Sequence, residues 1–580
     1  MAASGASVVE ADGALETMAE LRAALGAERE RATALERERD QLREAYQELQ
    51  IEMELLRRRI FAAKAERMDT AQLLLEFAEK QKELDALVAE LEPAAPATGP
   101  KTKRKPTGRR DLLRNKDLPV ERLEIPDAEM EALVASGAAK RMGFEESASI
   151  KWRRGGAVCL VVARIKYRLA KNTDAADVSA RLDAPALPTT LVTATMPPAI
   201  LPRSLGTPSL YAKIAAEKFS RGMPLYRQEE QFQHEGCPID RGTMCRWLEE
   251  IGAILGVSVV NAARLEAMGT AFCLATDATG IWVQPIATGD KKRQACKRGH
   301  FFVQIADRDH VFFEYTERET SKAVLEMFRG FSGYVQADAK SVYDILFRDP
   351  DQEPPERDAA PDPAKRSEVG CWSHGRRGFW EAAVGAKETV AREALFRIGR
   401  LFEYEEKWRG LEPAQRKAMR DRFSRPEVED FLAWADVEYR KVEHQRGLLR
   451  SALGYVRNQK EALGRFLDDG RLEMENNRSE RELRRIAVGR KAWLFVGSDD
   501  HAEAAANFFS VIASAKLHRL DPEAYLRDLL RVLPHWPQDR YLELAPKYWA
   551  ATRGRLDPVE LEREIGWLTI PPPPELSPVT

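Results

Sequence analysis

The chain has 580 residues, of which 44% are hydrophobic and 31% charged, and its 90 Lys and Arg balance 92 Asp and Glu. This length is too great for one compact core and predicts roughly three or four folding units of ~150 residues. No run approaches the ~18 uninterrupted apolar residues of a membrane span, and no secretory signal pattern is present, so we expect a cytoplasmic protein. The six cysteines form no Cys-x-x-Cys pair, which argues against a disulfide framework and a ribbon-type zinc site.

Residues 14–92 are predicted to form a leucine-zipper coiled coil. Leucine recurs at every seventh residue, at Leu35, Leu42, Leu49 and Leu56. Three of these leucines are followed after four residues by a second apolar position, at Tyr46, Met53 and Ile60. Such a heptad pattern, with Arg39 as the one poor fit, sustains a coiled coil of two or three strands. A single long amphipathic helix packed on its own protein is the alternative.

Residues 93–117 are predicted to be a basic linker, because prolines end the helix and 101–116 holds eight basic residues against one acid. This segment buries nothing and cannot fold alone, so we read it as a flexible arm that pairs with phosphates. A merely solvated linker is the alternative. The candidate DNA contacts in the arm are Lys103, Arg104, Lys105, Arg109 and Arg110.

Two small units follow. Residues 118–205 contain short β-like runs and are expected to be a small β-containing module. Residues 206–265 contain short helices, one of them capped by Asp240, and resemble a helix-turn-helix. In that reading Arg241, Thr243 and Arg246 face DNA, while Met244, Trp247 and Leu248 form the packing. An ordinary three-helix bundle is the alternative.

Residues 268–384 are expected to form the first part of a catalytic core with a ribonuclease H-like α/β sheet. The run 272–285 reads as a buried strand ending near Asp277, 298–315 as a hairpin, and 334–346 as a strand ending at Asp338 and leading into a helix. A strand that runs into a helix follows at 369–384. This order places Asp277 and Asp338 at neighbouring strand ends.

Two adjacent carboxylates repel each other unless a cation bridges them, and oxygen ligands suit Mg²⁺ or Mn²⁺. Two such ions ~4 Å apart can activate an attacking oxygen and stabilise a leaving one in phosphodiester cleavage. One strand-end Asp alone is usually a turn or cap residue. The pair in this topology instead predicts a site for two ions, which needs a third carboxylate.

The third carboxylate is expected at Glu480, in the last part of the core at 467–506. Glu480 lies four residues after Asn476 and so shares its helical face, and Asn477 and Glu475 lie beside them. Basic residues interleaved with Trp493 and Phe495 then form a predicted phosphate-binding stripe of Arg481, Arg484, Arg485, Arg490 and Lys491. The alternative is a charged helix that is exposed to solvent and binds nothing. The carboxylates are separated by 338 − 277 = 61 and 480 − 338 = 142 residues, and an all-helical insertion at 385–466 accounts for the longer gap.

The chain resembles the transposases of bacterial insertion-sequence family sixty-six. The resemblance rests on LATDATGIWV, GYVQADAKSVYDILF, GCWSHGRRGFWEA and the long block ENNRSERELRRIAVGRKAWLFVGSDDHAEAAANFFSVIASAKLHRLDPEAYLRDLL. It implies a multidomain α+β protein with a leucine zipper, a helix-turn-helix, an Asp-Asp-Glu core of Asp277, Asp338 and Glu480, and a C-terminal module at 507–545 followed by a tail at 546–580.

Some positions depart from the family pattern. Cys371 and His374 match a Cys-x-x-His element found in many such enzymes, and a core histidine is the alternative for His374. The family usually reads Asp-Asn-Asn where this chain has Glu475-Asn476-Asn477, so Glu475 rivals Glu480 as the third carboxylate. The family commonly carries a cysteine-rich zinc segment, but residues 125–175 contain only Cys159, so we expect no zinc.

The sequence therefore predicts a DNA transposase that binds the terminal inverted repeats of its own element and uses two Mg²⁺ or Mn²⁺ ions for strand cleavage and transfer. Expected partners are DNA, a second copy through the zipper to form at least a homodimer, and accessory proteins of the same element. A decayed or domesticated copy that only binds DNA is the second hypothesis. A coiled-coil structural protein is the third, and it leaves the strand-end aspartates unexplained.

Overall fold

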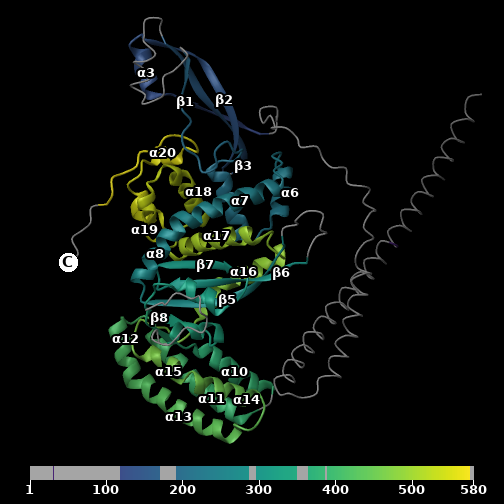
Figure 1. The fold of residues 1–580 in the computed structure, drawn as a ribbon, viewed down its shortest axis with the longest axis vertical. Coiled ribbons are helices and arrows are strands. Elements are labelled where there is room, and N and C mark those ends of the chain that lie inside the picture. Colours follow the sequence, from purple (N-terminus) through teal and green to yellow (C-terminus); the bar gives the residue numbers. More distant parts are fainter. Residues whose placement is uncertain are drawn as a thin grey trace, which may run out of the picture. The chain divides into compact units, whose positions relative to one another are not determined.

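The computed structural model describes residues 31, 118–153, 155–169, 191–285, 295–348, 364–385 and 388–574. The predicted zipper (14–92, apart from residue 31) and the basic linker (93–117) lie outside these residues. The described chain is mixed α+β, with many helices and two mixed sheets (Figure 1). It forms two compact units: the described part of the first holds 375–399 and 430–458, and that of the second holds 118–374, 400–429 and 459–574.

The first sheet belongs to the second unit and occupies the region expected to hold a small β-containing module. Its strands are β1 (Val120–Ile125), β2 (Ala139–Arg153), β3 (Gly156–Leu169) and β4 (Leu191–Thr193). Strand β3 lies between β1, which is parallel to it, and β2, which is antiparallel, and β4 pairs antiparallel with its C-terminal end. The helix α3 (Ala128–Ala135) begins at Asp127, whose carboxylate accepts the first free N–H groups. Val162, Tyr167 and Met130 form part of the buried core between helix and sheet.

The second sheet carries the candidate site. It is formed by β5 (Cys273–Val283), β6 (Lys297–Ala306), β7 (His310–Thr316), β8 (Gly333–Gln336) and β9 (Arg366–Val369). The strand order is β7-β6-β5-β8-β9. Strands β5, β6 and β7 are antiparallel neighbours, whereas β8 and β9 run parallel to β5. The β6–β7 turn contains Asp307 at φ +49°, and its carboxylate accepts the N–H groups of Phe272 and Cys273 at 2.8 and 2.9 Å.

Strand β5 does not end near Asp277, contrary to the expectation from sequence. It continues to Val283 because β6 pairs with it along its whole length from Leu274, with Asp277 opposite Val303. Only the pairing with β8 stops earlier, at Ala275 and Gln336. Asp277 therefore lies in mid-strand, at the point where its parallel neighbour has ended.

The helices of residues 206–270 are short segments with π-helical turns between them. They are α5 (Pro208–Ala215), η2 (Ala216–Ser220), α6 (Leu225–His234), α7 (Arg241–Leu255), η3 (Gly256–Val260) and α8 (Asn261–Thr270). Asp240 caps α7 by accepting the Thr243 N–H at 3.0 Å. The expected packing residues of α7 are buried: Met244, Trp247 and Leu248 are at most 7% exposed.

The continuous stretch Arg241–Thr270 is long and apolar enough, by length and composition alone, to cross a membrane. Packing of part of this stretch in the protein core is another explanation of its apolar composition. Helix α7 packs against α17 (Asp499–Leu517), which in turn lies on β7 (Figure 1). Several of its apolar side chains, such as Ile251, Leu255 and Val259, are buried in the core of the second unit, whereas Val257 and Leu265 are exposed.

Helix α17 makes side-chain hydrogen bonds to the free edge of β7. The N–H groups of Val311 and Phe313 donate to the hydroxyls of Ser514 and Ser510 at 2.9 and 2.7 Å. The same hydroxyls donate back to the carbonyl oxygens of these two residues at 3.0 and 3.4 Å. Buried backbone groups need such partners, and here a helix supplies them.

The chain between β7 and α17 is largely helical. Its helices are α9 (Ser321–Met327), η4 (Ser341–Phe347), α10 (Trp372–Gly385), α11 (Thr389–Trp408), α12 (Pro413–Met419), η5 (Arg420–Ser424), α13 (Arg425–Val442), α14 (Leu448–Asn458), α15 (Lys460–Gly464), η6 (Arg465–Leu467) and α16 (Asn477–Trp493). The stretch expected as an all-helical insertion, 385–466, contains α11 to α15. In the first unit, the ion pair of Arg397 with Asp430 at 2.7 Å and the edge-to-face contact of Phe379 with Phe431 join its two segments.

A buried ion network fixes the loop that precedes α16. Arg420 is fully buried and bonds the Glu405 carboxylate, which also accepts from Arg416 at 2.6 Å. Arg420 further donates to the carbonyl oxygens of Phe466, Asp469 and Leu472 at 2.7 to 2.9 Å. The loop 466–473 is therefore held by a charged group that has no access to water.

The C-terminal region continues as packed helix beyond α17. It contains α18 (Pro522–Val532), η7 (Leu533–His535), η8 (Gln538–Leu544), α19 (Pro546–Arg553) and α20 (Pro558–Glu562). The expected boundary at 507 falls inside α17, and the expected tail includes α19 and α20. Trp549 and Leu561 in these helices are 2% and 4% exposed, so this part of the tail belongs to the core.

Candidate active site

The parallel pairing of β5 with β8 brings Asp277 and Asp338 together. The register joins residue i of β5 to residue i + 61 of β8, as in Ala275 opposite Gln336, and the two aspartates are also 61 residues apart. Each aspartate lies two residues beyond this last pair, and both carboxylates lie within 3.9 Å of the Lys340 ammonium. Their side chains are 15% and 13% exposed.

A lysine that the sequence analysis did not single out lies between the two carboxylates. The Lys340 ammonium is 3.3 Å from Asp338 Oδ2, 3.9 Å from Asp277 Oδ1 and 3.6 Å from Glu319 Oε1. Although burial opposes the charge, the three carboxylates raise the pKa of Lys340. The spacing Asp-x-Lys in ADAK was the available sequence signal.

Burial dominates the electrostatics of Asp277. It raises the pKa of this carboxyl to about 6, and the charges of Asp338 and Glu480 add to the rise, while the Ala278 N–H and Lys340 oppose it. One oxygen of Asp338, Oδ1, is buried and has no hydrogen-bond partner among the described residues. Two carboxylates in such surroundings need a positive charge beside them.

The buried side chain of Asn476 fixes the start of α16, and with it Glu480, against β5. Its amide donates to the carbonyl oxygen of Thr276, the residue before Asp277, at 2.7 Å, and its own oxygen accepts from Ser479 at 2.7 Å. The Asn476 N–H also donates to the Cys371 sulfur at 3.2 Å. Asn476 thus has a structural role that the sequence did not reveal.

Glu480 and Glu475 lie in different surroundings. Glu480 is in the first turn of α16, close enough for its charge to raise the pKa of Asp277, and its Oε1 is 3.7 Å from His374 Nε2. Glu475 instead accepts the hydroxyl of Ser373, at the start of α10, at 2.9 Å. This arrangement favours Glu480 over Glu475 as the partner of the two aspartates.

The donor set fits a hard divalent cation in its chemistry. Asp277, Asp338 and Glu480 offer carboxylate oxygens, which Mg²⁺ and Mn²⁺ prefer, and the Lys340 ammonium lies where a cation would neutralise the two aspartates. Within the described ranges, no three His, Cys, Asp or Glu side chains converge closely enough to hold an ion. Of the three, only the two aspartates are already adjacent.

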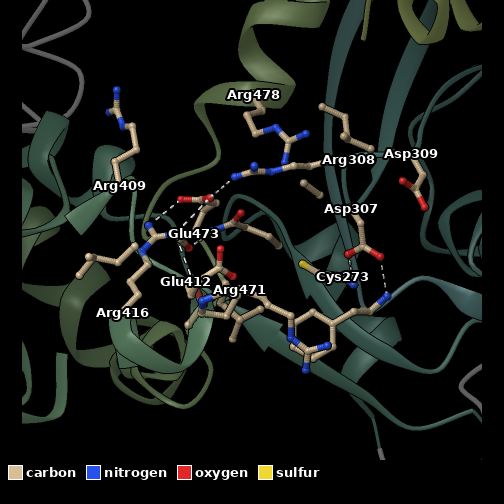
Figure 2. A pocket seen from close by; sticks show the side chains of 18 of the residues that line it. Cys273, Asp307, Arg308, Asp309, Arg409, Glu412, Arg416, Arg471, Glu473 and Arg478 are labelled. Atoms are coloured by element: carbon tan, nitrogen blue, oxygen red, sulfur yellow. Dashed lines mark hydrogen bonds and ion pairs between the residues drawn. The ribbon is translucent and has the colours of Figure 1, made fainter. Parts of the chain in front are cut away.

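A large pocket lies beside the carboxylates on the same face of the sheet. Its volume is about 700 Å³, and its lining includes Cys273, Ala275 and Gln336. Ala275 and Gln336 precede the two aspartates by two residues, a step of about 7 Å along a strand. Figure 2 shows the guanidinium groups of Arg308 and Arg478 at this pocket, with Arg308 3.9 Å from Glu473. A polyanion could thus contact the pocket and the carboxylates together.

The other predicted DNA contacts are distributed over several elements. On α7, Arg241 and Arg246 are exposed, and Thr243 bonds both Asp240 and Arg246. On α16, Arg481, Arg484 and Lys491 are exposed, whereas Arg485 bonds Glu482 and Arg490 bonds Thr279 and Gly280 of β5. The five candidates of the basic arm lie outside the described residues.

Comparison with known proteins covers most of the chain. The profile described as Transposase IS66 family matches residues 203–504, the IS66 C-terminal element matches 510–546, and Transposase C of IS166 homeodomain matches 48–123. Two uncharacterized proteins of Sinorhizobium fredii, y4hP and y4qI, are 28% and 27% identical over 60% and 61% of this chain. The alignments span 63% and 65% of the length of these relatives.

Proposed function

Because the chain belongs to the Transposase IS66 family, we propose that it is a DNA transposase that acts on the terminal inverted repeats of its own insertion sequence. The family and the homeodomain match imply DNA as the partner. The observation that carries the proposed chemistry is the pair Asp277–Asp338, aligned by the 61-residue register beside Glu480. The order β7-β6-β5-β8-β9, with its mixture of parallel and antiparallel pairs, supports a ribonuclease H-like core.

In the proposed reaction, water hydrolyses the phosphodiester at the end of the element and leaves a free 3′-hydroxyl. That hydroxyl then attacks a phosphodiester of the target DNA and expels a new 3′-hydroxyl, so no covalent enzyme intermediate is needed. Two Mg²⁺ or Mn²⁺ ions, when bound by Asp277, Asp338 and Glu480, would supply activation of the attacking oxygen and stabilisation of the leaving one.

The chain's own residues have defined parts in this proposal. Asn476 keeps Glu480 beside β5, and Lys340 balances the charge of the aspartates before ions bind. Arg308 and Arg478 contact the strand next to the cut. Pairing of two element ends requires at least a dimer, and we propose that the zipper at 14–92 forms the contact between the two copies. DNA as the substrate would locate the reaction in the bacterial cytoplasm, with the nucleoid.

The alternative is a decayed copy that binds DNA without cutting it. The presence of all three carboxylates argues against decay. Cleavage of a labelled duplex carrying the terminal repeat, in Mg²⁺ or EDTA, separates the two. We expect metal-dependent cleavage at the repeat boundary that is abolished by Asp277→Ala and Glu480→Ala but survives Glu475→Ala. Cleavage retained by Asp277→Ala refutes the triad, and binding without cleavage in every metal supports decay.

A further inference from the structure

A second pocket, between η2 and α16, has only basic residues in its charged lining. Its volume is about 250 Å³. The charged side chains that line it are Lys218, Arg221, Arg481, Arg484 and Arg485. Phe219, Trp493 and Phe509 supply apolar surface beside them, which limits water and strengthens electrostatic attraction in the pocket.

Three of these five cations have no hydrogen-bond or ion-pair partner among the described residues. Arg221 is paired with Glu217 and Glu523 at 2.8 and 2.9 Å. Lys218, Arg481 and Arg484 form no hydrogen bond or ion pair with any residue that the structure describes.

Only part of the Arg485 guanidinium group has a partner among the described residues. Its Nε lies 3.1 Å from Glu482, while its Nη1 is buried and has no hydrogen-bond partner within the described chain. A buried guanidinium N–H without an acceptor is costly, because it has lost water and gained nothing in return. An acceptor oxygen supplied by a ligand would remove that cost.

The grouping of like charges has electrostatic consequences nearby. Burial lowers the pKa of Lys218. Burial also lowers the pKa of Lys516 on α17, and the charges of Arg485 and Arg221 lower it further. Only the Lys516 shift reports the neighbouring cations, and an anion bound in the pocket would offset the part of it that Arg485 and Arg221 cause.

Gly222, which follows η2, lies beside Gly489 of α16 at the edge of the pocket. Gly222 follows η2 at φ +76°, and a Cβ added there would lie 3.9 Å from the Cα of Gly489. A Cβ on Gly489 would lie only 2.7 Å from Nε1 of Trp493. Helix α16 packs against η2, and the cations of both elements therefore line one cavity.

We infer that this pocket binds a backbone phosphate of the DNA and that Lys218 is a DNA contact; this inference rests on the proposed function. Arginine and lysine donors match the non-bridging oxygens of a phosphodiester, and a phosphate carries the charge that the pocket lacks. Arg485 follows Glu480 by five residues, about 7.5 Å along the helix. A phosphate held there would lie on the same helix as Glu480, between one and two turns away and on a different face.

The test measures binding without cleavage. Affinity of the full-length protein for a terminal-repeat duplex would be followed by fluorescence anisotropy in EDTA over a range of salt concentrations. Lys218→Met and Arg485→Gln keep side-chain size, and Lys322→Met, an exposed lysine on α9, is the matched control. Each pocket variant should weaken binding and reduce the slope of log K against log salt by about 1, whereas the control should leave both unchanged.

A chemical probe locates the contact on the DNA. Duplexes with a single neutral methylphosphonate should weaken wild-type binding at one or two positions, and the same substitution should cause no further loss in Lys218→Met. Unchanged slopes in both pocket variants, with metal-dependent cleavage intact, overturn the pocket alone. Absence of any binding by the folded wild-type protein overturns the proposed function and the pocket with it. Melting temperatures of all variants check folding.

Discussion

Replacing Arg420 by Met should be among the most destabilising single substitutions in the second unit. The guanidinium is fully buried, paired with Glu405, and bonded to three loop carbonyl oxygens. Breaking a buried pair by removing one partner costs about 3–5 kcal/mol, because the other charge stays behind. Orphaned carbonyl oxygens cost about 1–3 kcal/mol each, and these costs overlap, so we expect a total of about 4 kcal/mol or more.

The loss should be localised, and hydrogen exchange can measure it. Peptides covering 466–480 should lose protection in Arg420→Met, because their loop depends on this side chain. Arg422→Met, an exposed neighbour on η5, is the matched control and should change stability by no more than about 0.5 kcal/mol. Glu405 keeps Arg416 as a partner at 2.6 Å, so adding Glu405→Gln to Arg420→Met should recover little of the loss. A loss below about 1.5 kcal/mol for Arg420→Met would refute the reasoning.

Three further outcomes follow from local contacts. Burial alone would raise the pKa of Glu266, but hydrogen bonds from neighbouring side chains lower it to about 2. The ionised carboxylate therefore stabilises the fold fully above pH ~4.5, and this contribution falls by up to about 3 kcal/mol as the pH drops to ~2. Denaturation of wild type and Glu266→Gln across this range should show a steeper fall in wild type, because other carboxylates with lowered pKa values, such as Asp469 and Asp499, titrate in both proteins. Gly252→Ala would bring a Cβ to 2.6 Å from Ala504 and should lower the free energy of unfolding by about 1–3 kcal/mol. The control Gly269→Ala meets no atom within 4 Å and should not lower it. Equal denaturation midpoints for the two variants would contradict this reasoning. Asn476→Ala should abolish cleavage yet retain binding of the repeat, and loss of binding in anisotropy would contradict its positioning role.

Much of the sheet could be predicted from sequence, because its signals are local. The hairpin at 298–315 follows from two apolar runs joined by Asp307-Arg308-Asp309, and the helices of the insertion follow from their periodicity. The end of β5 could not be predicted, since the length of β6 decides it and nothing near Asp277 reports that length. The π-helical turn η2 was missed for a similar reason, because one extra residue in a helical turn leaves the apolar spacing nearly unchanged.

The candidate site was predictable in its acids but not in its cations. Asp277 and Asp338 were recognisable because each accompanies an apolar strand, and Glu480 because it shares a helical face with Asn476, with the family resemblance supporting all three. Lys340, by contrast, reads as one of many exposed lysines until the register brings it between two carboxylates. Lys218 contributes to a pocket only because α16, more than 250 residues later in the chain, packs beside it. Such pairings across long sequence separations cannot be read from one segment.

The serines of α17 also prevent a further strand from pairing with the free edge of β7. An unpaired edge strand normally invites another strand to add to it, from a second molecule or from an aggregate. On β7 that position is occupied by Ser510 and Ser514, which belong to the matched C-terminal element. A second copy of the chain therefore cannot pair with β7 at this edge, and a chain cut before residue 510 would leave the edge uncovered. Fragments of the catalytic core produced for study should keep this element if they are to stay in solution.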